Sequence, residues 1–381
     1  MKPINSKLNL FIGLMSGTSM DGIDAALVHI PNEAESDSPF TLIKTYSHPM
    51  PLQLKEDLSS LCQPSYDAIN RMGRCDVELG RLFADCCLQL LAESNYKPSD
   101  IKAIGSHGQT IRHMPFEKIP FTLQIGDPNT ITANTNITTV ADFRRRDMTH
   151  GGQAAPLTPA FHQFAFQQQG THRWILNIGG IANITYLPAD KHAAIIGFDT
   201  GPGNTLLDQW CLKHCNKPFD AQGDWAASGC IDNKLLTLML SDPYFTLAYP
   251  KSTGREYFNL AWLNSHLKQI ARSISAQDIQ ATLLELTVSS IASSIKDIDT
   301  YPTDIFVCGG GVHNIALMTR LQELRPQLNV QTTNALGLHP DWVEAVTFAW
   351  LAKQTLERKP GNVPSVTGAK KLSILGAIFP A

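Results

Sequence analysis

The sequence predicts an α/β protein made of two similar domains, and three observations lead to this prediction. At 381 residues the chain is longer than one hydrophobic core usually supports. Short apolar segments typical of strands alternate with segments of helical periodicity. Two strand pairs with glycine-rich tips, at 16–22 and 179–183, stand near the start of each half. A duplicated architecture of this kind would place two domains across a cleft, where small-molecule sites are common.

The first half is expected to combine short strands with one long helix. Strands are expected at 8–15 and 23–30, where apolar runs flank the first glycine-rich tip, and again at 101–106 and 137–141. A helix is expected within 65–93, because apolar side chains recur there on one helical face. This order of elements is typical of an α/β domain.

The second half repeats the opening pattern of strand, glycine-rich turn and strand. Strands are expected at 174–178, 184–187, 195–198 and 305–307. Helices are expected at 205–214, 281–295 and 341–356. The last of these helices carries apolar residues at the spacing of a buried face, so it is expected to belong to a core.

Composition and charge describe a soluble globular protein. Hydrophobic residues make up 43% of the chain, charged residues 17%, and the formal net charge is −3, which argues against a nucleic acid as the main partner. No stretch approaches the ~20 apolar residues needed to cross a bilayer, so no membrane partner is expected. The eight cysteines show neither C-x-x-C nor zinc-ligand spacing. A reducing compartment is favoured, and we expect a cytoplasmic protein.

The first glycine-rich tip carries groups that suit an anion. Its glycines let the backbone approach a ligand and expose successive N–H groups, which attract phosphate. Asp21 and Asp24 could then hold a hydrated Mg²⁺ ion, which prefers carboxylate and water oxygens. The alternative is an ordinary tight hairpin built from turn-forming glycine, serine and aspartate. These residues alone leave both interpretations open.

Two further glycine-rich turns follow strands in the second half. One contains Gly179 and Gly180, and the other contains Gly309, Gly310 and Gly311 and opens a helix. Three successive glycines suit close backbone approach to a flat base and its ribose. Opposed phosphate loops from the two halves would bind one nucleotide from both sides, whereas the alternative is two unrelated hairpins. Walker A, Rossmann and protein-kinase motifs are absent from the sequence, so a phosphotransferase here would have another architecture.

Asp199 is the candidate general base. It follows the short apolar segment 195–198 and precedes a Gly-Pro-Gly-Asn sequence and a helix. A carboxylate at a strand end facing a cleft is well placed to take a proton from an attacking hydroxyl or water. The alternative is that Asp199 caps the following helix, but Asn204 is the better cap candidate because Pro202 and Gly203 intervene.

Three more polar features are candidates for substrate contacts. The arginines of the run 142–147 suit an anionic group, although such runs are usually solvated turns. Glu344 interrupts an apolar helical face, where a carboxylate is costly unless hydrogen-bonded. It is therefore either a contact for a sugar hydroxyl or a residue on the wet side of the helix. The segment 253–258 suits carbohydrate contact or is a surface loop.

A series of short motifs runs along the chain in one order: 13–24, 105–110, 142–147, 151–157, 177–183, 198–204, 251–258, 308–311 and 364–369. With these motifs the sequence closely resembles the anhydro-N-acetylmuramic acid kinase family, a branch of the actin-like ATPase and sugar kinase superfamily. The resemblance covers essentially the whole chain. It departs from the family pattern at Gly152-Gln153-Ala154, where Gly-Gln-Gly is more usual.

The resemblance implies an α/β fold of two RNase H-like domains of the actin-like ATPase type, facing each other across a deep nucleotide cleft. The N-terminal domain would comprise residues 1–140 with about 355–381, and the C-terminal domain residues 141–354. The implied cofactors are ATP and Mg²⁺, and the implied substrate is the small molecule 1,6-anhydro-N-acetylmuramic acid. A homodimer is the oligomeric state that we consider.

The resemblance also implies roles for individual residues. Asp199 would be the general base, and Asp127, Arg145 and Glu344 would lie at or near the sugar. The resemblance implies Mg²⁺ without naming its ligands, and Asp21 and Asp24 stay the candidates that the residues themselves suggest. The nucleotide would be held by Gly17, Thr18, Ser19, Met20, Asp21, Gly22, Ile23, Asp24, Gly179, Gly180, Gly309, Gly310, Gly311 and Asn314.

The implied reaction joins a hydrolysis to a phosphoryl transfer. Asp199 would deprotonate a water that attacks the anomeric carbon, the internal ether would open, and the freed oxygen at carbon six would take the γ-phosphoryl group. The products would be N-acetylmuramic acid 6-phosphate and ADP, as in peptidoglycan recycling. The alternative is an ordinary hexose or amino-sugar kinase of the same superfamily without ring opening. An assembly or chaperone ATPase is a more distant alternative.

Overall fold

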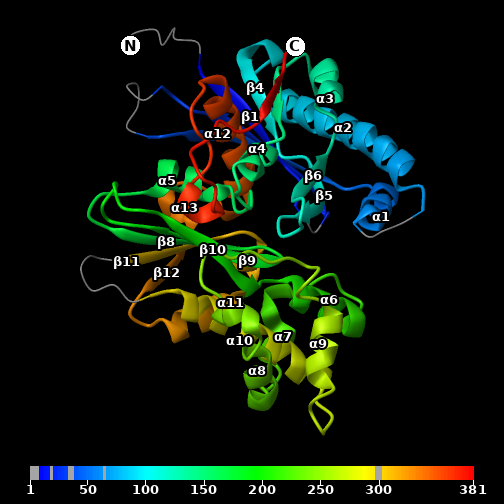
Figure 1. The fold of residues 1–381 in the computed structure, drawn as a ribbon, viewed down its shortest axis with the longest axis vertical. Helices are drawn as coiled ribbons and strands as arrows, with labels where there is room; N and C mark the ends of the chain where they lie inside the picture. Colours follow the sequence, from blue (N-terminus) through cyan, green and yellow to red (C-terminus); the bar gives the residue numbers. More distant parts are fainter. Residues whose placement is uncertain (1–7, 18–19, 33–37, 63–65, 297–302) are drawn as a thin grey trace. The chain divides into compact units, whose positions relative to one another are not determined.

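The computed structural model describes residues 8–17, 20–32, 38–62, 66–296 and 303–381. Two large mixed sheets with helices packed on them confirm the predicted α/β class (Figure 1). The chain divides into two compact units, Met1–Ala165 with Trp342–Ala381, and Phe166–Asp341. Within the ranges described, no helix is both long and apolar enough to span a membrane.

The first unit is built on a six-stranded sheet with the order β13-β7-β4-β1-β2-β3. β1 pairs antiparallel with β2, and β2 pairs antiparallel with β3. β4 lies parallel to β1, β7 lies parallel to β4, and β13 closes the edge antiparallel to β7. The strands are β1 (Leu10–Met15), β2 (Gly22–His29), β3 (Thr41–Pro49), β4 (Ile101–Ser106), β7 (Thr139–Ala141) and β13 (Ala377–Phe379). A separate hairpin consists of β5 (Gln109–Met114) and β6 (Phe121–Ile125).

Helices cover both faces of this sheet. They are α1 (Leu52–Leu61), α2 (Ala68–Ala92), η1 (Pro98–Asp100), α3 (Pro128–Thr135), α4 (Arg145–Thr149), α5 (Thr158–Phe166), α12 (Val343–Leu356) and α13 (Pro364–Thr367). Ile12 and Leu14 of β1 share a core with α2. Gly13, which alternates with them, faces α12, and a Cβ there would lie 1.8 Å from a backbone oxygen of that helix. Gly105 of β4 pairs with Gly13 and is equally close to α12, so two glycines let this helix pack directly on the sheet.

The second unit is built on a five-stranded sheet with the order β10-β9-β8-β11-β12. β8, β9 and β10 are antiparallel, whereas β11 lies parallel to β8 and β12 parallel to β11. This order and orientation match those of β3-β2-β1-β4-β7 in the first sheet, which confirms the duplicated architecture predicted from the two glycine-rich tips. The strands are β8 (His172–Ile178), β9 (Ile181–Leu187), β10 (Ile196–Pro202), β11 (Thr303–Cys308) and β12 (Asn329–Thr332).

The core of the second unit lies between this sheet and α10. Trp174, Leu176 and Ile178 of β8 are buried together with Leu283 and Leu286 of that helix. The helices are α6 (Thr205–Cys215), η2 (Ala221–Gly223), α7 (Asp224–Ala227), α8 (Asn233–Leu240), η3 (Pro243–Thr246), α9 (Leu260–Leu267), α10 (Ala276–Ser294), η4 (Gly310–His313), α11 (Ile315–Leu324), η5 (Thr333–Leu336) and η6 (Pro340–Trp342). The opposite face of β8 carries its polar residue Asn177 toward the site described below.

The two compact units divide the chain at different places from the expected domain boundaries. The expectation assigned 141–354 to the C-terminal domain, whereas residues up to Ala165 and from Trp342 onward belong to the first unit. The reason is that α12 packs on β1 and β4, and that the segment after β7 is hydrogen-bonded to the C-terminal segment. The expected arrangement of two domains across a cleft stays a prediction.

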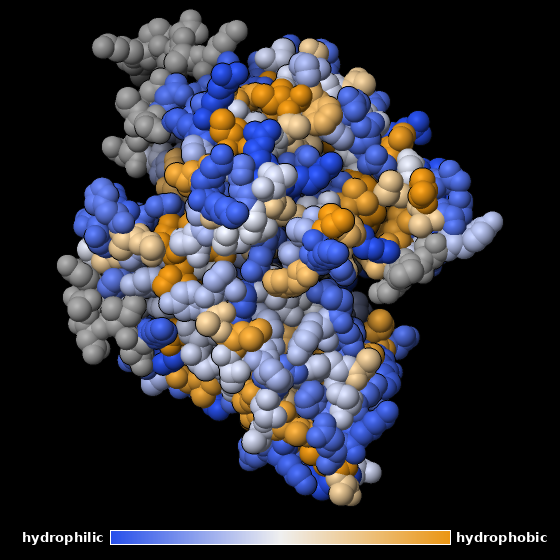
Figure 2. All heavy atoms as spheres, viewed as in Figure 1, coloured by the Kyte–Doolittle hydropathy of each residue, from blue (hydrophilic) through white to orange (hydrophobic). Residues whose placement is uncertain are grey.

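The surface is that of a globular protein. On the face shown in Figure 2, hydrophilic, neutral and hydrophobic residues are interspersed over both units. The most exposed large apolar side chains of the first unit lie near α1 and α2 and on the β5–β6 hairpin: Leu52, Tyr66, Ile69, Phe116 and Ile119. Single exposed apolar residues are usual on protein surfaces and require no functional explanation.

Candidate active site

The turn after β1 is fixed by buried polar groups. The Ser16 hydroxyl lies 2.7 Å from Gln109 Oε1 and 3.2 Å from the Gly22 carbonyl oxygen. Met20 is buried with a φ of 55°, and its N–H donates to the Gly17 carbonyl at 3.1 Å. Both ends of the turn are therefore pinned, but phosphate binding there stays a prediction. Two of the predicted nucleotide contacts lie outside the described residues: Thr18 and Ser19.

The two aspartates predicted to bind Mg²⁺ have different partners. Asp21 is exposed and forms an ion pair with Lys55 at 2.7 Å. Asp24 lies in β2 and accepts a hydrogen bond from Ser47 at 2.8 Å, while the Ile23 side chain between the aspartates is fully buried. Carboxylate oxygens suit Mg²⁺, yet no group of three or more metal-ligating side chains occurs among the residues that the structure describes. Mg²⁺ binding by this pair stays a prediction.

His107, directly after β4, is held in one tautomer by its neighbours. Its Nδ1 lies 2.8 Å from the Gly108 carbonyl oxygen, which can only accept, so Nδ1 carries the proton. Nε2 then accepts from the Arg144 guanidinium, whose two nitrogens lie at 2.9 and 3.1 Å. Burial, and then the Arg144 charge, lower the pKa of His107 to about 3. His107 is therefore neutral near pH 7 and links Arg144 to the end of β4.

Because His107 is buried as the neutral form, acid should destabilise the protein through this residue. In the unfolded chain a histidine binds a proton near its ordinary pKa of about 6.5, whereas folded His107 binds one only near its pKa of about 3. Its contribution to the free energy of unfolding is complete above the unfolded pKa and falls by about 1.4 kcal/mol per pH unit as the pH decreases. Urea denaturation of the protein and of His107→Gln from about pH 7 to about pH 4.5 checks this. The variant should lose less stability on acidification, and equal losses would exclude His107 as the cause.

The three arginines of the run 142–147 differ in what they contact. Arg144 is used internally, because it donates to His107 and to a backbone carbonyl. Arg146 donates to a backbone carbonyl at 3.0 Å, and Arg145 pairs with Asp142 at 3.0 Å. The Arg145 side chain is 61% exposed, so most of its guanidinium is open to solvent. A sugar contact by Arg145 stays a prediction, whereas Arg144 has a role within the fold.

Asp147 joins three motifs that are distant in the sequence. Its carboxylate is fully buried, and one oxygen accepts from the Ala154 N–H at 2.8 Å. The other oxygen accepts from Asn362 at 2.8 Å and from the Thr367 hydroxyl at 2.9 Å. We call these four residues the Asp147 junction. It fixes the segment 151–157, most of which has no regular secondary structure, against the C-terminal segment.

Ala154 in this junction has a left-handed backbone conformation, with a φ of 55°, and is fully buried. Such a conformation costs alanine about 1 kcal/mol relative to glycine. Ala154→Gly is therefore expected to raise the free energy of unfolding by about 0.5–1 kcal/mol, measured by urea denaturation. Ala84→Gly, within α2, should instead lower it by about 1 kcal/mol. Similar losses at both positions would show that the backbone at Ala154 is not strained.

The predicted sugar contacts Asp127 and Glu344 both lie at helix N-termini. Asp127 caps α3, where its carboxylate accepts from the N–H groups of Asn129 and Thr130 at 3.0 Å each. Burial would raise the pKa of Asp127, but hydrogen bonds from Thr130 and Asn129 outweigh it and lower the pKa. Glu344 is half-buried in the first turn of α12. The structure uses Asp127 as a helix cap, and sugar contacts by either residue stay predictions.

In the second unit, most of the predicted site residues meet at the end of the sheet where the carboxyl ends of three strands lie together. β8, β10 and β11 all end there, and the two glycine-rich turns follow β8 and β11. Asp199 pairs with Asn183 of β9, which pairs in turn with Asn177 of β8. Paired residues point to the same face, so these polar side chains form a row beside the turns. The Gly180 carbonyl accepts two N–H bonds from the segment 203–205 at 3.0 Å each, which joins the first turn to the end of β10.

Asp199 itself is held by the segment that follows β10 and η3. Its N–H donates to the Lys251 carbonyl at 3.1 Å, and its carbonyl accepts from the Tyr244 hydroxyl at 2.7 Å. Its Oδ2 accepts from the Thr253 N–H at 2.9 Å, and the residue is only 8% exposed. The N-cap position of α6 is occupied by Asn204, so Asp199 is not the helix cap. A buried carboxylate with a fixed direction is suited to accept a proton.

The glycines of the two turns differ in the space around them. A Cβ on Gly309 or Gly311 would lie 2.2 or 2.3 Å from atoms of β8, so the fold itself requires glycine there. A Cβ on Gly179 or Gly310 would meet nothing closer than 3.5 Å, which is an ordinary van der Waals contact, so crowding does not require glycine at these two positions. Asn314 caps α11 by accepting from an N–H of its first turn at 3.0 Å, and its nucleotide contact stays a prediction.

Three residues beside Asp199 were not predicted as its neighbours: Tyr244, Lys251 and Thr253. Two of them lie in the motif 251–258, of which the part 253–258 was interpreted as a carbohydrate contact or a surface loop. The Thr253 N–H contacts the Asp199 carboxylate across 54 residues of sequence, and no local sequence pattern indicates such a contact. The segment therefore has a role in the site, because it orients the carboxylate.

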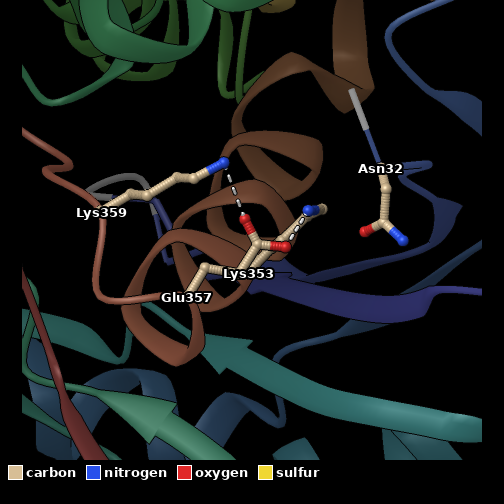
Figure 3. A pocket seen from close by; sticks show the side chains of 4 residues that line it. All are labelled: Asn32, Lys353, Glu357 and Lys359. Carbon is tan, nitrogen blue, oxygen red and sulfur yellow. Dashed lines mark hydrogen bonds and ion pairs between the residues drawn. The ribbon is translucent and has the colours of Figure 1, made fainter. Parts of the chain in front are cut away.

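A separate open pocket of about 370 Å³ lies in the first unit (Figure 3). It is lined by Asn32, Lys353, Glu357 and Lys359. Glu357 pairs with both ammonium groups, with Lys359 at 3.2 Å, so one carboxylate is shared between two lysines. None of the predicted site residues lines this pocket.

Comparison with known proteins identifies relatives over nearly the whole chain. Residues 9–381 match the family described as anhydro-N-acetylmuramic acid kinase. A protein of that name from Coxiella burnetii (strain RSA 493 / Nine Mile phase I) is 56% identical over 369 residues, which cover 97% of each chain. Another from Shewanella amazonensis (strain ATCC BAA-1098 / SB2B) is 53% identical over 373 residues, covering 98% of this chain and 99% of the relative. The solved structure of Acidaminococcus fermentans (R)-2-hydroxyglutaryl-CoA dehydratase component A gives a TM-score of 0.46 at 9% identity, covering 90% of this chain and 96% of that one, a similarity too distant to indicate function.

Two sheets of the same strand order, with a buried aspartate beside glycine-rich turns in the second unit, form a duplicated α/β fold with one candidate catalytic carboxylate. A kinase that acts on a sugar transfers a phosphoryl group to an alcohol. The chain belongs to the anhydro-N-acetylmuramic acid kinase family, because the match extends over nearly its full length at more than half identity. The family and enzyme class predicted from the motifs are thereby confirmed.

Proposed function

We propose that the protein opens the 1,6-anhydro ring of 1,6-anhydro-N-acetylmuramic acid with water and transfers the γ-phosphoryl group of ATP to O6. The products would be N-acetylmuramic acid 6-phosphate and ADP. Membership of the family supports the proposal. The observation that carries it is the buried Asp199 carboxylate, oriented by the Thr253 N–H beside the glycine-rich turns.

Asp199 acts as the general base in this proposal. Its carboxylate takes a proton from a water molecule, and the water oxygen bonds to C1 of the sugar as the C1–O6 bond breaks. The electron pair left on O6 then forms the bond to the γ-phosphorus. The bond from this phosphorus to the bridging oxygen breaks, and ADP leaves. The contacts of Asp199 favour this step because they hold the carboxylate in its reactive orientation before the water attacks, so no conformational entropy is lost in the reaction.

ATP is proposed to bind at the predicted glycine-rich turns. Gly179 and Gly310 suit this role because no atom of the fold would lie closer than 3.5 Å to a Cβ at either position, so their backbone is not crowded. The adenosine end is proposed to lie at Gly309, Gly310 and Gly311, the three successive glycines after β11. Mg²⁺, with Asp21 and Asp24 as the proposed protein ligands, would neutralise charge on the transferring phosphoryl group.

An ADP-release assay with the anhydro sugar tests the proposal. We expect ADP with this substrate, and none above background with N-acetylmuramic acid or glucosamine. In ¹⁸O-labelled water the sugar phosphate should gain one heavy oxygen, at C1, because water opens the ring. Turnover of plain amino sugars without ring opening would favour the ordinary sugar kinase instead.

We further propose that the protein acts in the cytoplasm, in peptidoglycan recycling. The eight cysteines show neither C-x-x-C nor zinc-ligand spacing, and a disulfide framework is unusual in a chain of this size, which suits a reducing compartment. The proposed partners are the anhydro sugar and ATP, without a nucleic acid or a membrane. The predicted homodimer is tested by light scattering on the eluted protein, and a monomer at micromolar concentration would exclude a stable dimer.

A further inference from the structure

Lys251 places a buried positive charge beside the candidate base. The residue is only 9% exposed. Its Nζ donates to the Tyr244 carbonyl at 3.2 Å and lies 4.6 Å from the centroid of the Tyr244 ring and 5.8 Å from that of Phe198. Among the residues that the structure describes, no carboxylate oxygen lies within 4.0 Å of this nitrogen. The ammonium group is thus held by one carbonyl and by aromatic faces.

Such an arrangement is costly for the fold. A buried ammonium without a carboxylate in contact loses much of its hydration free energy. The aromatic faces offset part of this loss, since a cation over a ring is attracted by its negative face. A neutral side chain of similar length would avoid the cost. The position of the charge therefore calls for a reason other than stability.

The same backbone segment holds both Lys251 and Asp199. The Lys251 carbonyl accepts the Asp199 N–H, and two residues later the Thr253 N–H binds the carboxylate. Tyr244 contacts both residues, through its hydroxyl to Asp199 and through its ring and carbonyl to Lys251. Burial lowers the pKa of Lys251, and the Asp199 charge opposes this effect. The interaction is mutual, so the ammonium favours the ionised carboxylate by the same free energy.

We propose that Lys251 is a positioning residue for the reaction, whose buried ammonium keeps the Asp199 carboxylate ionised and ready to accept the proton of the attacking water. The inference rests on the proposed function of Asp199 as the general base. Lys251 acts through Asp199 and its backbone, without contact to the reacting atoms.

Other groups around Asp199 do not supply this charge. Tyr244 faces it from η3 as a neutral phenol, whose pKa burial and then the Asp199 charge raise. β9 presents the amide of Asn183, and the part of α10 that reaches the end of β10 presents hydroxyl groups. The remaining charged or titratable side chains of the segment and of the surroundings of η3 are Asp242, Tyr249, Arg255, Glu256 and Tyr257, with Lys296, whose Nζ lies 5.8 Å from the centroid of the Tyr249 ring. All of these except the half-buried Asp242 are exposed. Lys251 is the buried cation of this neighbourhood among the described residues of the second unit.

Two neutral variants, Lys251→Gln and Lys251→Met, test the inference through the pH dependence of kcat/KM. Without the nearby cation, the Asp199 carboxylate keeps its proton to higher pH, so the acid limb should move up by about one pH unit. On that limb kcat/KM should fall about tenfold below that of the unchanged protein. Lys251→Arg keeps the charge and should keep the limb near its original position. Thermal unfolding is measured for each variant, and only variants with a cooperative unfolding transition are compared.

Tyr244→Phe is the matched control, because it removes a hydroxyl from the same cluster and keeps the ring and all charges. It should leave the acid limb in place, whatever it does to the rate. An unmoved limb in a folded neutral variant overturns the inference, and so does an equal shift in Lys251→Arg or Tyr244→Phe. Full activity of Asp199→Asn is a different result, which overturns the proposed base itself.

Discussion

Asp199→Asn is expected to lower kcat by about 10³-fold while the affinity for ATP changes little. Asparagine has nearly the same shape as aspartate, and its amide oxygen can still accept the hydrogen bond from the Thr253 N–H. It cannot take up a proton near neutral pH, so water attack on C1 would lose its base. Turnover is measured by ADP release, and ATP binding by isothermal titration calorimetry.

Asp304→Asn is the matched control for this experiment. Asp304 lies at the start of β11, the end of the strand opposite to its glycine-rich turn, and the control makes the same chemical change in the same sheet. It should retain nearly full turnover. Near-normal turnover of Asp199→Asn would remove Asp199 from the mechanism, whereas loss of ATP binding would assign it a structural role.

Elements with a strong local pattern could be predicted from the sequence. The helix expected within 65–93 is α2, and the one expected at 341–356 is α12, because both carry apolar residues at helical spacing. The helix expected at 281–295 begins earlier, at Ala276, because the Ser275 hydroxyl accepts the Asp278 N–H and starts it there. The sheet against which α12 packs could not be predicted, since periodicity shows that a face is buried but not what buries it. The packing of α12 on this sheet depends on Gly13 and Gly105, which leave room for the helix backbone.

The residues of the candidate site also differ in whether a local sequence pattern could predict them. Asp199 could be selected because an apolar strand, a carboxylate and a Gly-Pro-Gly sequence are adjacent in the chain. Lys251 and Thr253 could not, because about 50 residues separate them from Asp199 and their contacts depend on the folded segment between η3 and α9. Asp147 is the extreme case, with partners 215 and 220 residues away. Its position in a run of charged residues favoured a solvated turn, whereas the fold buries it completely.

Asp147→Ala is expected to lower the free energy of unfolding by about 3–4 kcal/mol. The substitution removes the acceptor for three buried donors, those of Ala154, Asn362 and Thr367. Each donor left without a partner costs about 1–3 kcal/mol, and relaxation of the segment 151–157 recovers part of the sum. Urea denaturation followed by circular dichroism gives the change, provided that the slope with urea concentration stays the same.

Thr367→Ala separates the carboxylate from one of its donors. It removes a single hydrogen bond of the Asp147 junction and leaves two, so a loss of about 1 kcal/mol is expected. Glu93→Ala removes an exposed ion pair with Lys44 at 3.3 Å and should leave the unfolding midpoint nearly unchanged. If Asp147→Ala lost no more stability than Thr367→Ala, water would be satisfying the other two donors. The segment 151–157 would then be held by its backbone contacts, such as the Gln153 N–H to the Thr367 carbonyl at 2.7 Å, and not by the buried carboxylate.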